Sequence, residues 1–165
     1  MDHTDRPDSP GPLDATPPSL LDLTTYLLSK TGKAARLRLA ERLAERDLRL
    51  WHMAVLAALA DHGPHVQREL ATRLAIDPSD VVKVLDGLAA AGQVERARDT
   101  ADRRRVLVTL TTEGRTALDQ LRAEAREVQD ELLAPLTTDE RAQLHGLLRK
   151  VFAGVAGAGM DGGAA

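Results

Sequence analysis

The chain of 165 residues contains no cysteine. A disulfide framework, a zinc site with thiolate ligands and a switch based on thiol oxidation are therefore excluded. Aromatic residues are nearly absent too, because Trp, Tyr and Phe occur once each and make up 2% of the chain. Since 43% of the residues are nevertheless hydrophobic, the core has to be built from Leu, Val and Ala. This composition favours packed helices with at most a small sheet.

Long hydrophobic runs are also missing. No stretch of about 18 apolar residues occurs, and the acidic, proline-rich start does not look like a secretory signal peptide. We therefore expect a cytoplasmic protein that has no membrane partner.

Sequence motifs of catalysis are not found. The chain has no Gly-rich phosphate loop, no nucleophile–base motif and no HExxH motif, so nothing in it supports an enzyme. His52, His62 and His65 are close in sequence, but no carboxylate cluster at ligand spacing accompanies them. The sequence predicts neither a cofactor nor a metal site.

The composition changes at both ends of the chain. Residues 1–19 contain five prolines and four aspartates, and we expect them to form a disordered arm. Residues 156–165 consist mostly of Gly and Ala and are expected to be a disordered tail. Helical periodicity over 20–47 predicts an N-terminal helix, and over 112–155 it predicts a C-terminal pair of helices.

The central segment, residues 48–111, has the pattern of a winged helix-turn-helix domain. Two short predicted helices are separated by the turn Ala75–Asp77; Asp77 can cap the second helix, and Pro78 takes its first position. After Gly92 the apolar period changes to two in "QVERAR" and "RVLVTLT", which a turn at "DTAD" can join. The predicted fold is mainly α with a small β-hairpin wing and terminal helices.

The predicted wing is basic although the chain carries a net charge of −3. Arg103, Arg104 and Arg105 are adjacent on the strand that leaves the wing tip. Three adjacent arginines usually belong to a solvated surface. On a wing that follows a helix-turn-helix, however, they favour contact with DNA.

Both terminal segments carry apolar seams. Apolar residues step by three and four from Leu118 to Leu132, and again from Leu144 to Val155. A small single domain does not need long helices with such seams at both ends of its chain. The pattern therefore predicts a homodimer assembled through the terminal helices.

The stretch "DRRRVLVTLTTEG" resembles the wing and following helix start of the MarR-type winged helix-turn-helix regulators. The family pattern is Asp-x-Arg, a few residues, then Val-x-Leu-Thr-x-x-Gly. It is matched by Asp102, Arg104, Val108, Leu110, Thr111 and Gly114. "VLAALADHG", "ELATRLAI" and "LDGLAAAGQVER" also match in order and spacing, so the resemblance covers roughly residues 20–155.

This resemblance implies a homodimeric transcriptional regulator that binds a pseudo-palindromic double-stranded DNA operator. Its recognition helix, residues 78–90, would enter the major groove. The expected groove-facing residues are Pro78, Ser79, Val82 and Lys83. In wings of this kind Asp102 orients Arg104 toward the minor groove, and Arg103 beside it is a further DNA-contacting candidate. Asp80 stands where the family often has Thr, which suggests a different site preference or fewer contacts with the DNA backbone.

The resemblance also implies a repressor that a small aromatic effector, often a phenolic acid, releases from DNA. The candidate ligand-binding residues are Tyr26, Trp51 and His52. The alternative is a winged helix that serves only as a protein–protein interaction module without specific DNA binding. Such a module would not need a basic wing together with an exposed lysine on the second helix.

Overall fold

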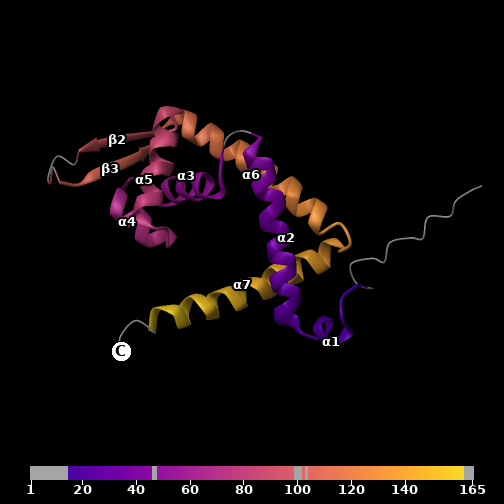
Figure 1. The fold of residues 1–165 in the computed structure, drawn as a ribbon. Helices are drawn as coiled ribbons and strands as arrows, with labels where there is room; N and C mark the ends of the chain where they lie inside the picture. Colours follow the sequence, from indigo (N-terminus) through magenta and orange to yellow (C-terminus); the bar gives the residue numbers. More distant parts are fainter. Residues whose placement is uncertain (1–14, 46–47, 99–101, 103, 162–165) are drawn as a thin grey trace, which may run out of the picture.

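The structure, a computed structural model, describes residues 15–45, 48–98, 102 and 104–161. Figure 1 shows a mainly helical chain with a small sheet, as the composition predicts. The elements are α1 (Pro18–Leu21), α2 (Thr24–Ala44), α3 (Leu50–His62), β1 (His65–Val66), α4 (Gln67–Leu74), α5 (Pro78–Ala90), β2 (Val94–Arg98), β3 (Val106–Leu110), α6 (Thr112–Leu132) and α7 (Thr138–Asp161).

The predicted wing is confirmed as the antiparallel hairpin β2–β3, in which Arg96 lies opposite Val108. The sheet has a third strand that the sequence pattern does not reveal, because β1 pairs with β3 on its other side, in the order β1-β3-β2. A strand of two residues is too short to show the alternation from which strands are predicted. β1 attaches the wing to the start of α4.

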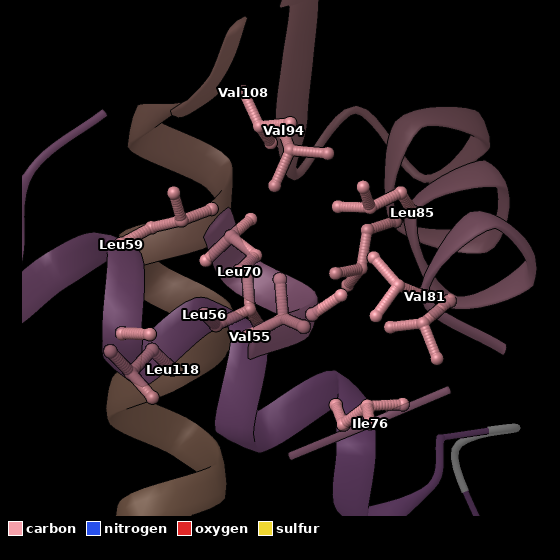
Figure 2. Close-up of a cluster of buried hydrophobic side chains, with 14 of the residues drawn as sticks. Val55, Leu56, Leu59, Leu70, Ile76, Val81, Leu85, Val94, Val108 and Leu118 are labelled. Carbon is pink, nitrogen blue, oxygen red and sulfur yellow. The ribbon is translucent and has the colours of Figure 1, made fainter. Parts of the chain in front are cut away.

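The core lies where α3, α4, α5, the sheet and α6 meet (Figure 2). Leu56, Leu70 and Leu85 are 0% exposed there, and the valines of the sheet close one side. The inward face of α5 consists of Val81, Val84, Leu85 and Leu88, which are all buried. Complete burial of such a side chain contributes about 1.5–3 kcal/mol, so this small cluster provides much of the driving force for folding.

A joint between the wing and α6 explains the Thr-x-x-Gly motif. The Thr111 hydroxyl accepts a hydrogen bond from the Gly114 amide at 3.0 Å and donates one to the Gly92 carbonyl at 2.7 Å. A Cβ at Gly114 would lie 2.0 Å from the Gln93 carbonyl oxygen, so only glycine allows this approach. Threonine thus caps α6, and glycine lets α6 pack against the backbone at the start of the wing.

Two predicted boundaries are wrong. The helix α1 begins at Pro18, inside the expected arm 1–19, because proline fits the first turn of a helix. The helix α7 continues to Asp161 instead of ending before a tail at 156, since its alanines favour the helical conformation and offset the cost of the glycines. Residues 1–14 of the arm and 162–165 of the tail lie outside the described residues.

The terminal helices leave the winged body, as Figure 1 shows for α6 and for α7, which turns back from its end. Arg42 of α2 forms an ion pair with Glu131 of α6 at 3.0 Å, and Leu43 inserts into the core. A capping box starts α7, because the Glu140 carboxylate accepts a hydrogen bond from the Thr137 amide at 2.8 Å. Apolar side chains remain exposed on α2 and α7, including Leu37 at 56% and Phe152 at 75%.

Candidate nucleic-acid interface

The turn between α4 and α5 is fixed by three residues. Ala75 ends α4 with a left-handed φ of 50°, and Ile76 is buried beneath the turn. The Asp77 carboxylate then accepts bonds from the Ser79 amide at 2.8 Å and from the Ser79 hydroxyl at 2.6 Å. These two bonds lower the pKa of Asp77 and keep the cap ionised. The orientation of α5 is therefore set at its first turn.

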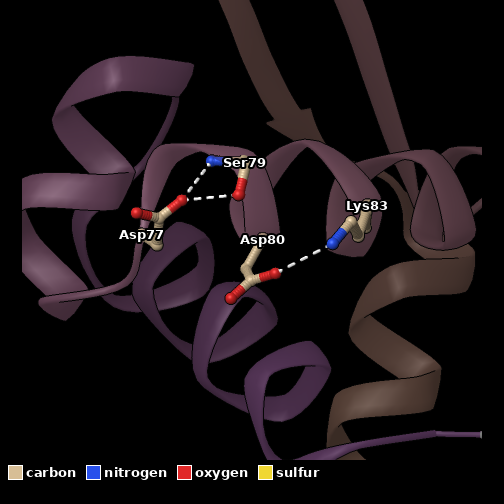
Figure 3. A network of polar contacts seen from close by, with 4 residues as sticks. All are labelled: Asp77, Ser79, Asp80 and Lys83. Atoms are coloured by element: carbon tan, nitrogen blue, oxygen red, sulfur yellow. Dashed lines mark hydrogen bonds and ion pairs between the residues drawn. The ribbon is translucent and has the colours of Figure 1, made fainter.

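The outward face of α5 carries the residues expected to enter a major groove. Pro78, Ser79 and Lys83 are exposed, and Val82 is half-buried. Lys83 Nζ lies 3.2 Å from Asp80 Oδ1 (Figure 3). The four candidates thus share one accessible face of α5. The acid Asp80, which is not one of the candidates, is exposed beside them.

Two wing arginines bind the wing to the helices. Arg96 of β2 donates to Asp86 of α5 and, at 3.4 Å, to Gln67 of α4. Arg105 lies 2.9 Å from Glu69 of α4. Exposed pairs of this kind contribute little to stability, but they hold the hairpin against the helix-turn-helix.

The rest of the wing leaves positive charge accessible. Arg98 and Arg104 are exposed, and within the described part of the wing neither side chain is paired with an acid. Asp102 Oδ1 accepts a bond from the Arg104 backbone amide at 3.0 Å. Asp102 therefore acts on Arg104 through the backbone of the turn, and no bond joins it to the guanidinium. Arg103 lies outside the described residues.

His52 lies between two clefts beneath α5. Its Nδ1 accepts a hydrogen bond from the Arg49 amide at 2.9 Å, so the proton of the neutral ring is on Nε2, which faces Gly87. Burial, and then the charge of Arg49, lower the pKa of His52. The ring is therefore a neutral hydrogen-bond donor at physiological pH.

The first cleft, of about 460 Å³, opens between α3, α5 and α6. It is lined by Leu48, His52, Gly87, Ala91, Gln93, Ala117, Gln120 and Leu121. Sequence reasoning finds only His52 of this set. The others are small or uncharged residues from separate segments, and no local pattern distinguishes them from packing residues.

The other two ligand candidates lie elsewhere. Trp51 lines the second cleft, also of about 460 Å³, together with Arg49, His52, Asp80, Lys83 and Val84. Tyr26 lines neither cleft and lies on α2, where Lys30 Nζ is 5.3 Å from its ring centroid. Tyr26 and Leu43 are separated by about 25 Å along α2 at 1.5 Å per residue. The structure brings Trp51 and His52 together but not Tyr26.

The remaining histidines make local contacts. His65 donates from Nδ1 to the Gly63 carbonyl at 2.8 Å, and its ring meets that of His62 edge to face. In the part of the chain that the structure describes, no three His, Cys, Asp or Glu residues are placed to hold a metal ion. Nor do these residues form a helix both long and apolar enough to cross a bilayer.

Comparison with known proteins places this geometry in a family. Residues 50–106 match the model of the MarR family. The chain is also 31% identical over 144 residues to the HTH-type transcriptional repressor NicR of Pseudomonas putida, with 87% of this chain and 91% of NicR covered. The chain belongs to the MarR family. The resemblance seen in the wing motif is thereby confirmed over most of the chain.

Two solved structures of the family show the same fold. A mutant of Escherichia coli MarR in complex with operator DNA has a TM-score of 0.63 and 31% identity, and covers 77% of this chain and 91% of that one. Bordetella bronchiseptica BpsR, whose DNA binding is regulated by 6-hydroxynicotinic acid, has a TM-score of 0.66 and 28% identity, with 82% and 97% covered. This chain is thus a MarR-family transcriptional regulator with the winged helix-turn-helix fold.

Proposed function

We propose that this protein is a homodimeric repressor that binds a pseudo-palindromic operator and releases it when a small aromatic acid binds. The observation that carries the proposal is the common exposure of the outward face of α5 and of the wing arginines Arg98 and Arg104, on a wing held against α4 and α5. A helix end that presents polar side chains suits a major groove, and an exposed guanidinium suits the adjacent minor groove or backbone. The relatives that are named as repressors, and the operator complex of Escherichia coli MarR, support this function.

The dimer is proposed from the exposed apolar side chains of the terminal helices. On α7, Leu147 and Val151 are each 52% exposed, and Phe152 and Val155 are more so. Leu27 and Leu37 of α2, and Leu23 just before its first residue, are at least 42% exposed. A second copy of the chain would cover both surfaces and place two α5 helices about 34–36 Å apart, one turn of DNA.

DNA binding is tested with operator fragments selected from the source genome, measured by fluorescence anisotropy over a salt series. Arg104→Ala should weaken binding to operator and scrambled duplex alike and reduce the salt slope by about 0.9 per lost phosphate contact. Lys83→Ala should instead change which bases are tolerated. Arg149→Ala on α7 is the control and should leave the slope unchanged. Retention of neither operator nor scrambled DNA at modest salt would refute the function.

For Asp102, charge and the proposed positioning role predict opposite changes in DNA affinity. Removing an acid beside DNA should tighten binding by charge alone. If Asp102 positions Arg104 through the hydrogen bond that it accepts from the Arg104 backbone amide, Asp102→Ala should weaken binding to both duplexes. Tighter binding by this variant would contradict the role proposed for Asp102.

The first cleft is the proposed effector site, since it is bounded by both α6 and the recognition helix α5. The Nε2–H of His52 offers a polar contact beside the apolar side chains of Leu48, Ala117 and Leu121, which suits a small aromatic ring with a carboxylate or hydroxyl group. Trp51 flanks the second cleft beside His52, and Tyr26 would take part only from a partner subunit.

The effector site is tested with 6-hydroxynicotinic acid, the ligand that regulates BpsR. Ala117→Leu should fill the cleft and abolish ligand-induced release of DNA while operator affinity stays within about threefold. Ala123→Leu, an exposed position on the same helix, is the matched control. Release that persists in Ala117→Leu would exclude this cleft.

A non-catalytic role in the cytoplasm, where the chromosome lies, is part of this proposal. The alternative, an interaction module without specific DNA binding, receives no support from the relatives.

A further inference from the structure

The N-cap and the first two turns of α5 contain four polar side chains, and only two of them remain free to recognise bases. The Asp77 carboxylate is occupied as the helix cap, and the Ser79 hydroxyl donates its hydrogen to that carboxylate. Asp80 and Lys83 are left, with side chains 54% and 75% exposed. Because α5 is anchored on its opposite side by Val81, Val84 and Leu85, this pair projects from a rigid support.

Asp80 and Lys83 form a donor–acceptor pair of defined spacing. Lys83 Nζ and Asp80 Oδ1 are 3.2 Å apart, one helical turn along the exposed face (Figure 3). In the major groove a G·C pair presents the acceptors N7 and O6 of guanine and the N4 amino donor of cytosine. O6 and N4 are themselves joined by a base-pairing hydrogen bond, so they too are about 2.9 Å apart. The two pairs have opposite polarity and nearly equal spacing.

We propose that Asp80 is a specificity-determining residue that reads one G·C pair in each operator half-site together with Lys83. Lys83 Nζ donates to guanine O6 and N7, and Asp80 accepts the groove-facing hydrogen of cytosine N4. An A·T pair also has an amino donor beside an acceptor, adenine N6 and thymine O4. It fits this arrangement less well, because O4 has no second acceptor next to it and lies beside the thymine methyl group. The inference rests on the proposed DNA-binding function and adds a base preference to it.

The acid has a cost that base recognition would offset. A carboxylate close to the phosphate backbone repels it, so charge alone predicts that Asp80 weakens binding to any sequence. If Asp80 only neutralises Lys83, its removal should tighten binding to all DNA by one common factor. If Asp80 reads cytosine, its removal should also eliminate the sensitivity to one hydrogen atom of the operator.

The test uses the full-length protein and an operator in which each G·C pair is altered symmetrically in the two half-sites. Cytosine is replaced by N4-methylcytosine, which still pairs with guanine but has lost its groove-facing hydrogen. At one position, methylation should lower the operator affinity of the parent protein by about tenfold or more per half-site. This is the effect expected for losing a hydrogen bond to a charged group. Asp80→Ala should bind both operators within about twofold and should bind scrambled DNA more tightly than the parent.

Two control variants separate the contributions. Lys83→Ala should remain sensitive to methylation, because Asp80 is still present. Asp119→Asn, which removes an exposed charge from α6, should keep the parental methylation effect. Thermal melting of Asp80→Ala near the parental Tm shows that the variant is folded, as expected for an exposed helix position.

The possible results separate the role of Asp80 from the proposed DNA-binding function. A parent protein that binds specifically but is indifferent to methylation at every half-site cytosine would overturn the role of Asp80 alone. An Asp80→Ala variant that stays fully sensitive to methylation would do the same. A parent protein that binds operator no better than scrambled duplex would overturn both the inference and the proposed function.

Discussion

The winged body and the terminal helices place their large apolar side chains in opposite environments. Leu56, Leu70 and Leu85 of the body are 0% exposed, whereas Leu147 and Phe152 of α7 are 52% and 75% exposed. The body therefore completes its core within one chain, whereas the large apolar side chains of α7 stay exposed in a single chain. Since α6 contributes Leu118 and Leu121 to the body and also leads to α7, it belongs to both regions.

The largest expected effect comes from removing the helix that the two regions share. A chain ending at residue 111 lacks Leu118 and Leu121 and exposes the α3 residues they cover, so it should not fold cooperatively. Circular dichroism melting and solubility would measure this. A soluble, monomeric fragment 48–111 with a cooperative transition would show that the body is independent of α6.

A charge on the exposed face of α7 should separate assembly from folding. Phe152→Asp places a carboxylate in the proposed subunit interface and should raise the dimer Kd by at least about 30-fold, as expected for loss of a central apolar contact. Lys150→Asp on the same helix is the control. Analytical ultracentrifugation would give the two constants. An unchanged Kd for Phe152→Asp would place the interface elsewhere.

Gly114→Ala tests the joint between wing and α6. Its Cβ would lie 2.0 Å from the Gln93 carbonyl oxygen and 2.6 Å from Leu110 Cδ1, so the backbone has to shift. We expect a loss of about 1–3 kcal/mol in the free energy of unfolding, measured by denaturant titration. Gly32→Ala should be neutral or stabilising, because a Cβ at Gly32 would have no atom within 4 Å apart from the neighbouring backbone of its own helix. Equal effects of the two substitutions would contradict the close approach.

The smallest expected effect is a dependence of stability on pH at His52. Burial lowers its folded-state pKa below the ordinary 6.5, so the unfolded chain binds a proton first as the pH falls. Stability should therefore decrease as the pH falls below about 7 and stop decreasing below the folded-state pKa. His52→Asn keeps an acceptor for the Arg49 amide and should flatten this dependence in pH-resolved melts. An unchanged profile in His52→Asn would exclude this histidine as the cause.

Local chemistry made much of the body predictable from sequence. Asp77 before Pro78 defines the start of α5, and Gly92, with a φ of 68°, defines the change to the wing. The MarR-type wing motif is predictable for the same reason, since Thr111 and Gly114 each satisfy a local requirement. The strand β1 and the clefts were not predictable in this way. They depend on which segments meet in space, as Gln93 and Ala117 do at the first cleft.

In the candidate site, too, the features set by local spacing were predictable, and those set by contacts between distant segments were not. Pro78, Ser79, Val82 and Lys83 are found on one face because helical spacing alone determines which side chains point outward. The pairing of Arg96 and Arg105 with acids of α4 and α5 could not be read from the basic stretch, and it leaves fewer wing arginines for DNA than their number suggests. The aromatic chemistry of Tyr26 suggests a ligand contact, but Tyr26 lines neither of the clefts that Trp51 and His52 line.

The hydrogen bonds of Thr111 have a mechanical consequence. One residue bonds to the end of α5 through the Gly92 carbonyl and to the first turn of α6 through the Gly114 amide. The helix α6 is about 31 Å long at 1.5 Å per residue, so a tilt of about 5° about this point displaces its far end by about 3 Å. The same rotation would move the end of α5 much less, because α5 ends close to Thr111 whereas the terminal helices lie at the far end of α6.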